Sequence, residues 1–166
     1  MITYNDKTYK IRDFNKGDIE WIIKRHDTLY NEEYGFDETF KNYVSGSLKK
    51  FVKDFDSDKE NIWIAEVNSK AVGIIAIAKI DNERAQLRWF LIEPYMRGKG
   101  LGRDLINVAI EFCKQKNYKN AMLWTVSILS AARHLYKSFG FTIIETIEHE
   151  IWGKSLIEEK WYLSLE

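Results

Sequence analysis

The chain has 166 residues, and its 25 Lys and Arg balance its 25 Asp and Glu, so its formal net charge at pH 7 is zero. This length supports one domain with a sizeable core, and the balanced charge excludes a general attraction to nucleic acid or to anionic membranes. Cys113 is the only cysteine, which excludes an internal disulfide and a cysteine-built metal site. We therefore expect a single domain over residues 1–166 that is cytoplasmic and has no nucleic-acid or membrane partner.

The first half of the chain predicts one strand, two helices and three more strands. Residues 7–13 alternate between polar and apolar side chains, as a strand does. Asp18 begins a segment with apolar residues at helical spacing, and a second such segment follows Asp37. Three strand-like runs joined by short, turn-rich connections are typical of a β-meander, and they span residues 61–67, 71–80 and 85–92.

The second half predicts two helices that alternate with strands. Its segments are a helix from about 101 to 117, a strand at 121–127, a helix at 130–138 and strands at about 141–151 and 156–165. Ser130 is expected to cap the shorter helix. The element order β-α-α-β-β-β-α-β-α-β-β predicts an α/β (α+β) fold, in which a mixed sheet carries helices on both faces.

A glycine-rich loop precedes the longer of these helices and predicts an anion site. Three alternate glycines allow positive φ values and a close approach of the backbone to a ligand. The helix that begins near Leu101 offers unpaired N–H groups and the positive end of its dipole. The residues expected to bind the anion are Arg97, Gly98, Lys99, Gly100, Leu101, Gly102 and Arg103.

Two familiar phosphate motifs do not fit this loop. A Walker A loop needs Ser or Thr after its lysine, and Gly100 follows Lys99. The dinucleotide fingerprint needs a third glycine where Arg103 stands. A strand-to-helix turn with solvated basic residues is the simpler alternative, but Arg97, the helix start and the upstream Pro94 favour a ligand loop.

Two spaced motifs resemble those of the GNAT superfamily of N-acetyltransferases. Arg97, Gly100 and Gly102 match its coenzyme A signature, which is Arg or Gln, two residues, Gly, one residue, then Gly or Ala. The second family landmark reads Ala-x-x-Leu-Tyr, three residues, then Gly-Phe. It is matched at the right distance downstream by Ala132, Leu135, Tyr136, Gly140 and Phe141. The element order also resembles the family fold, so the likeness covers nearly the whole chain.

The resemblance implies an enzyme that transfers an acetyl group from acetyl-CoA, by direct attack, to a primary amine of a small molecule or peptide. It implies a mixed, mostly antiparallel sheet of about seven strands flanked by four helices. The backbone of Leu91 and Ile92, where the fourth strand splays from the fifth, would hold the pantetheine arm and the thioester carbonyl. The amides of residues 97–102 would bind the pyrophosphate, and Tyr136 would stand near the sulfur as general acid.

The chain departs from the family pattern at one position. Many relatives carry an asparagine three residues before the alanine of the second motif, and Leu129 stands there. A polar contact to the pantetheine is then missing or is supplied by Ser127 or Ser130. Segments 87–91, 123–127 and 131–136 are most similar to a subgroup that includes acetyltransferase domains fused behind a winged-helix regulator. This chain lacks that DNA-binding half, so DNA binding does not carry over.

The acceptor side is less sharply defined. Residues 30–36 join two helices and carry rings and carboxylates, which predicts Glu33 and Tyr34 at the acceptor site, with Glu33 as a candidate general base. Glu32 and Glu93 are alternative bases, whereas Gln86 cannot take up a proton.

Several single residues have both a structural and a functional interpretation. Arg88, inside an apolar strand, is either a paired structural arginine or a clamp for an acceptor carboxylate. Tyr136 lies on an apolar helical stripe, which is typical of a core tyrosine, but the two motifs favour a catalytic role. His26 is expected to be a satisfied core histidine. The three histidines are scattered without metal-ligand spacing, so we expect no metal.

Two other function classes stay open. A non-catalytic coenzyme A-binding sensor would keep the loop but transfer nothing, and a nucleotide-phosphate binder would prefer ATP to coenzyme A. The oligomeric state is also open between a monomer and a homodimer.

Overall fold

A mixed sheet of eight strands organises residues 2–3 and 8–166, which are the residues that the computed structural model describes. The strands lie in the order β1-β2-β3-β4-β5-β6-β8-β7. Every neighbouring pair is antiparallel except β5 with β6, which is parallel. The strands are β1 (Ile2–Thr3), β2 (Lys10–Asp13), β3 (Asn61–Val67), β4 (Lys70–Lys79), β5 (Arg84–Ile92), β6 (Asn120–Val126), β7 (Thr142–Ile151) and β8 (Lys154–Ser164).

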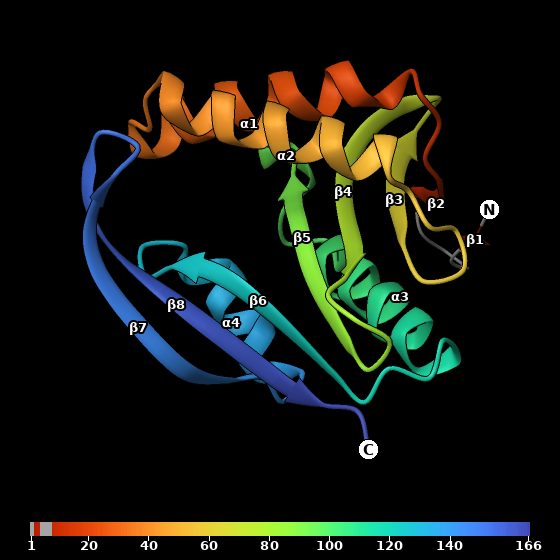
Figure 1. Cartoon of the computed structure of the whole chain (residues 1–166). Helices are drawn as coiled ribbons and strands as arrows, with labels where there is room; N and C mark the ends of the chain where they lie inside the picture. The colour runs from red at the N-terminus through yellow and green to blue at the C-terminus, as the bar shows by residue number, and fades with distance from the viewer. Residues whose placement is uncertain (1, 4–7) are drawn as a thin grey trace.

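Four α-helices cover the two faces of this sheet within the described part of the chain (Figure 1). They are α1 (Asp18–Tyr34), α2 (Glu38–Lys53), α3 (Leu101–Gln115) and α4 (Ser130–Ser138), and a short 3-10 helix, η1 (Pro94–Met96), precedes α3. One core cluster packs α1 and α2 on the sheet through residues such as Ile22 and Leu48, and a second packs α3 and α4 through Leu105 and Tyr136. The predicted mixed sheet with helices on both faces is confirmed.

The connection between α1 and α2 follows from two residues. Gly35 ends α1 in the left-handed conformation, with φ of 71°, and its N–H bonds back to the last turn. Asp37 then begins α2 by accepting a hydrogen bond from the N–H of Thr39. Because the connection is this short, the two helices lie side by side across one face of the sheet (Figure 1).

Most predicted elements appear within a few residues of their expected bounds, and three expectations need correction. Residues 30–34, expected in the connection between the first two helices, belong to α1, and only residues 35–37 join it to α2. The first predicted strand is shorter, since β2 covers Lys10–Asp13 and residue 7 lies outside the described residues. The prediction that Ser130 caps α4 is wrong, because Ser130 is its first helical residue and Leu129 occupies the cap position without a side-chain hydrogen bond. The two-residue strand β1 has no periodicity that a sequence could show.

Candidate functional site

Strands β5 and β6 pair over only three residues each and then separate. The paired residues are Arg84, Ala85 and Gln86 with Asn120, Ala121 and Met122. Beyond them the strands diverge into the V shape visible in Figure 1. Because β4 stays paired to the other side of β5 as far as Ile92, the gap side of β5 carries backbone N–H and C=O groups without a partner among the described strands.

A β-bulge in β5 changes the faces that its side chains occupy. Two residues of β5, Trp89 and Phe90, lie between two positions that pair with β4, whereas only one residue of β4 lies between the partner positions. Trp89 adopts a φ of 50°. Normal alternation would put Arg88 and Trp89 on opposite faces, but the Arg88 guanidinium carbon lies 4.4 Å from the Trp89 ring centroid. Trp89 joins the core under α1 and α2, whereas Phe90 packs against the core under α3 and α4. The bulge therefore brings Arg88 and Trp89 together.

The glycine loop borders a cavity of about 340 Å³. Gly98 and Gly100 have φ values of 76° and 85°, which glycine adopts at little cost, and Gly100 is the cap residue of α3. Gly102 serves packing, because a Cβ there would lie 2.8 Å from Leu135 Cδ1. Of the predicted cofactor residues, all but Lys99 line this cavity, namely Leu91, Ile92, Arg97, Gly98, Gly100, Leu101, Gly102 and Arg103.

The two arginines of the loop have different partners. Arg97 Nη2 lies 2.7 Å from Glu33 Oε1, and Glu33 and Tyr34 both line the loop cavity. Arg103 has no carboxylate partner within residues 8–166, and its guanidinium carbon lies 5.3 Å from the ring centroid of Phe139. The structure thus places Glu33 and Tyr34 beside the loop, and it does not bring them together with Arg88 as the sequence predicted.

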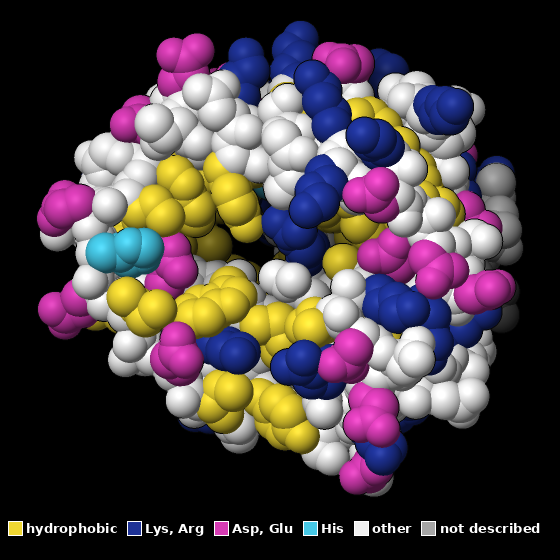
Figure 2. Space-filling model, viewed as in Figure 1, with side chains coloured by type: hydrophobic (Ala, Val, Ile, Leu, Met, Phe, Trp, Pro, Cys, Tyr) yellow, Lys and Arg dark blue, Asp and Glu magenta, His cyan; other side chains and the backbone are white. Residues whose placement is uncertain are grey.

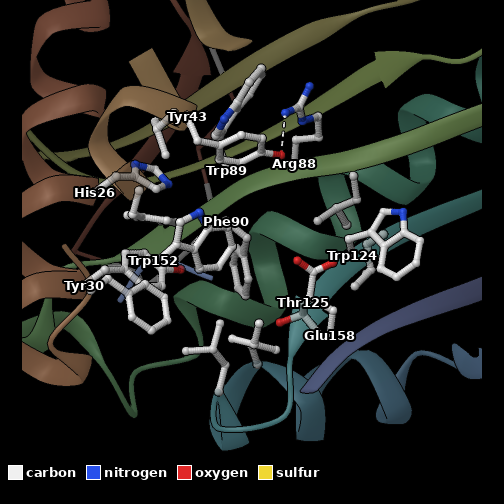
Figure 3. A pocket seen from close by; sticks show the side chains of 18 of the residues that line it. His26, Tyr30, Tyr43, Arg88, Trp89, Phe90, Trp124, Thr125, Trp152 and Glu158 are labelled. Atoms are coloured by element: carbon white, nitrogen blue, oxygen red, sulfur yellow. Dashed lines mark hydrogen bonds between the residues drawn. The ribbon is translucent and has the colours of Figure 1, made fainter. Parts of the chain in front are cut away.

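A second cavity, of about 350 Å³, adjoins the gap on the side of α1 and α2. Aromatic rings form much of its wall, namely Tyr30, Phe36, Phe40, Tyr43, Trp89, Phe90, Trp124, Tyr136 and Trp152. Figure 2 shows a hollow between the α1–α2 pair and the β6–β8 side of the sheet, with hydrophobic side chains around its mouth. Among the described residues that line it, Arg88 is the one cation and Glu158 the one carboxylate (Figure 3). We call this space the aromatic cavity.

Tyr136 stands where the two cavities meet. Tyr30, Phe90, Leu129 and Ala132 line both spaces, and Tyr136 lines the aromatic cavity with its ring 6.1 Å from that of Phe90. Its hydroxyl has no hydrogen-bond partner in residues 8–166. Burial raises the pKa of Tyr136 far above the usual tyrosine range, so the phenol keeps its proton at neutral pH. The residue can donate a hydrogen bond to a group placed between the cavities.

The carboxylates proposed as general bases occupy different environments. Glu93 is buried and forms two hydrogen bonds with Arg25, at 2.5 and 2.9 Å, so it is a structural partner. Glu158, which the sequence did not single out, reaches the aromatic cavity from β8, and its Oε1 lies 2.9 Å from His149 Nε2. Strand alternation alone could not find Glu158, because its position depends on the register that pairs it with Val126.

His26 lines the aromatic cavity and is only partly satisfied. Its Nδ1 lies 2.8 Å from the carbonyl oxygen of Ile22, which requires a proton on Nδ1, and its buried Nε2 has no partner within the described residues. Burial lowers its pKa from 6.5 to about 4, so the ring is neutral. The prediction that His26 is a buried core histidine is therefore confirmed, but the prediction that it is satisfied holds for only one of its two ring nitrogens.

Two other kinds of site, a metal centre and a membrane span, can be considered for residues 2–3 and 8–166. No group of three or more His, Cys, Asp and Glu side chains in that part of the chain is arranged to hold a metal ion. No helix within the same residues is both long enough and apolar enough to span a bilayer.

Comparison with known proteins identifies related sequences. The model of the acetyltransferase (GNAT) family matches residues 22–141. An uncharacterized N-acetyltransferase of Methanocaldococcus jannaschii is 32% identical over 159 residues, which cover 89% of this chain and 67% of that relative. An N-acetylaspartate synthetase of Xenopus tropicalis is 32% identical over 90 residues, but these cover 54% of this chain and only 33% of that relative.

The fold also has close counterparts among solved structures. An acetyltransferase of the GNAT family from Staphylococcus aureus Mu50 superposes with a TM-score of 0.78 at 18% identity, covering 95% of this chain and 99% of that one. At this identity the likeness concerns the fold, and it extends over nearly every element described above.

Proposed function

Because the chain belongs to the acetyltransferase (GNAT) family, we propose that it transfers an acetyl group directly to a primary amine of a small molecule or peptide. The predicted family and fold are confirmed, and acetyl-CoA is the co-substrate of this N-acetyltransferase. The observation that carries the proposal is the meeting of the two cavities at the gap between β5 and β6, beside Tyr136.

We assign acetyl-CoA to the cavity beside the glycine loop. The left-handed Gly98 and Gly100 and the free N–H groups of the first turn of α3 suit the pyrophosphate. The backbone N–H and C=O of Ile92, which face the gap side of β5 because Leu91 and Glu93 bond to β4, suit an amide of the pantetheine arm, and Leu91 lines the same cavity. Leu129 replaces a polar residue in the wall common to both cavities, so we expect this part of the arm to make an apolar contact.

The aromatic cavity then receives the amine. As the amine nitrogen bonds to the acetyl carbon, the carbon–sulfur bond breaks and the electron pair goes to the departing thiolate. The hydroxyl of Tyr136, protonated and without a partner in residues 8–166, would donate a proton to that sulfur, a role that its burial beside the meeting of the two cavities supports. The proton of the attacking amine leaves to a base on the acceptor side, and Glu158 is the one carboxylate among the described lining residues.

We propose a different role for Glu33 from that of a base. Its carboxylate pairs with Arg97 beside the loop, so it orients this arginine before the cofactor binds, and the pyrophosphate competes with it for the guanidinium. Tyr34 forms part of the same wall.

The test of this function is thiol release from acetyl-CoA in the presence of a panel of amines. We expect amine-dependent release of free coenzyme A together with an N-acetylated product. A protein that binds acetyl-CoA but releases no thiol with any amine would instead be the coenzyme A sensor. Tighter binding of ATP than of coenzyme A would favour the nucleotide binder. The homodimer and the cytoplasmic location stay predictions from the sequence.

A further inference from the structure

Each of the two cavities is lined by one arginine that has no carboxylate partner among the described residues. Of the seven arginines in the chain, five pair with a carboxylate, namely Arg12, Arg25, Arg84, Arg97 and Arg133. The other two, Arg88 and Arg103, have no such partner within residues 8–166, and each lines one of the two cavities. Arg103 lies beside the proposed pyrophosphate site, whose anion explains it. Arg88 in the aromatic cavity has no corresponding anion from the cofactor.

Arg88 is held in place by neutral groups. Its Nη2 donates to the Tyr43 hydroxyl at 3.1 Å, and its guanidinium stacks at 4.4 Å on the Trp89 ring that the bulge turns to the same face. Guanidinium has five N–H donors, and Tyr43 takes one of them, so a fork remains for a planar anion. Tyr43 and Trp89 therefore orient the cation without neutralising it.

Glu158 supplies the opposite charge in the same cavity. Figure 3 shows it reaching the space from the side of β6 and β8, together with Thr125 and Trp124, whereas Arg88 comes from β5 beside Tyr43. Aromatic rings fill much of the wall around these two charges. A polyamine would leave the charge of Arg88 unmatched, and an apolar amine would desolvate Arg88 without compensation.

On the basis of the proposed function of this cavity, the geometry points to an amino acid as the acceptor, with its carboxylate on Arg88, its amine toward Glu158 and an apolar or aromatic side chain against the rings. A zwitterion of this kind matches both charges of the cavity. Its volume of about 350 Å³ is at the small-molecule end of the range for ligand sites. Arg88 is thus the residue that determines the acceptor class.

The experiment screens the twenty amino acids with acetyl-CoA by thiol release, then compares the best one with its carboxamide and with its decarboxylated amine. We expect kcat/KM to be about 10- to 100-fold higher for the amino acid, as for one charged hydrogen-bonded contact. Arg88→Gln should remove this preference by lowering kcat/KM far more for the amino acid than for the carboxamide, and Arg88→Lys should restore part of it. Arg84→Gln, on the same strand but exposed and paired with Asp81, should behave as wild type.

The outcomes separate this inference from the function on which it rests. Equal turnover of the amino acid and its carboxamide, or an equal loss for both in Arg88→Gln, would overturn the carboxylate site while the acetyltransferase activity stands. If no amine supports thiol release, calorimetric binding of the same amino acids decides. Binding that requires Arg88 would support the site although the enzyme proposal had failed, and the absence of any binding would refute both.

Discussion

Removal of one oxygen from Tyr136 should separate catalysis from stability. In Tyr136→Phe the ring keeps its neighbours, with centroids at 6.1 Å from Phe90, 5.9 Å from Phe141 and 6.1 Å from Trp161. No residue in the stretch 8–166 bonds to the hydroxyl, so the substitution breaks no hydrogen bond of the free protein. We expect the free energy of unfolding to change by less than about 0.5 kcal/mol.

The effect on kcat should be large by comparison. A positioned general acid contributes about 10²- to 10⁴-fold, which corresponds to about 2.7–5.4 kcal/mol of transition-state stabilisation. Because burial holds the pKa of Tyr136 above the usual tyrosine range, the hydroxyl stays protonated throughout the working pH range. Ionisation of Tyr136 should therefore cause no fall of kcat at moderately alkaline pH. Wild type and Tyr136→Phe should have pH profiles of kcat with the same shape in that range.

The assay measures thiol release at saturating acetyl-CoA, with the cofactor-induced rise in melting temperature as the measure of binding. Tyr118→Phe is a matched control, since the Tyr118 hydroxyl bonds to the Lys59 carbonyl at 2.7 Å and the residue lines neither cavity. The control should lose about 1 kcal/mol of stability and keep its kcat. A folded Tyr136→Phe protein with wild-type kcat would refute the reasoning and make Tyr136 a core ring.

Three other predictions concern packing, the cofactor loop and pH. Gly102→Ala should destabilise the fold by about 1–3 kcal/mol, because its Cβ would lie 2.8 Å from Leu135 Cδ1. Gly46→Ala, with open space around the new Cβ, should stabilise the fold by about 0.5–1 kcal/mol. Urea unfolding measures both free energies, and equal effects of the two substitutions would contradict the packing role of Gly102. Glu33→Gln should tighten acetyl-CoA binding by up to about fivefold, or about 1 kcal/mol, because the substitution frees Arg97 from its carboxylate partner. The kcat should not change. A lower kcat at unchanged affinity for acetyl-CoA would instead indicate that Glu33 is the general base. The folded-state pKa of His26 is lowered to about 4, so the unfolded chain binds a proton that the folded one does not as pH falls below about 6.5. Stability should drop by about 2–3 kcal/mol between pH 7 and 4.5 from this group, and a His26→Leu protein with an equally steep pH dependence of its unfolding free energy would refute the assignment.

The part of the site that we propose for the cofactor could be predicted from the sequence because its residues are local. The glycine loop and the start of α3 are contiguous, and their backbone conformations follow from which residues lack a Cβ. Tyr136 was singled out because residues 132–141 resemble the second motif of the family. These features depend little on how distant strands pair.

The acceptor side depends on long-range register, which the residues themselves do not display. Nothing in the run that contains Trp89 signals a left-handed tryptophan and a bulge, so the residues predict only an unbroken strand over 85–92. Glu33 looked like an acceptor residue from the chemistry of its segment, but the fold pairs it with Arg97. Glu158 lies more than 60 residues from Arg88 in sequence, and only the β6–β8 register brings it to the cavity.

The bulge has a consequence for how such an enzyme can change its substrate. In a regular strand the side chains alternate between the two faces along the whole length. A shift of register at one end therefore changes which face the side chains at the other end occupy. In β5 the extra residue at Trp89 separates an upstream segment, whose Gln86 and Arg88 line the aromatic cavity, from a downstream segment, whose Leu91 and Ile92 line the cavity that we propose for acetyl-CoA. On the proposed function, other charges at the upstream positions should change the acceptor and leave the acetyl-CoA cavity in place, so we expect acceptor choice to be redesigned there.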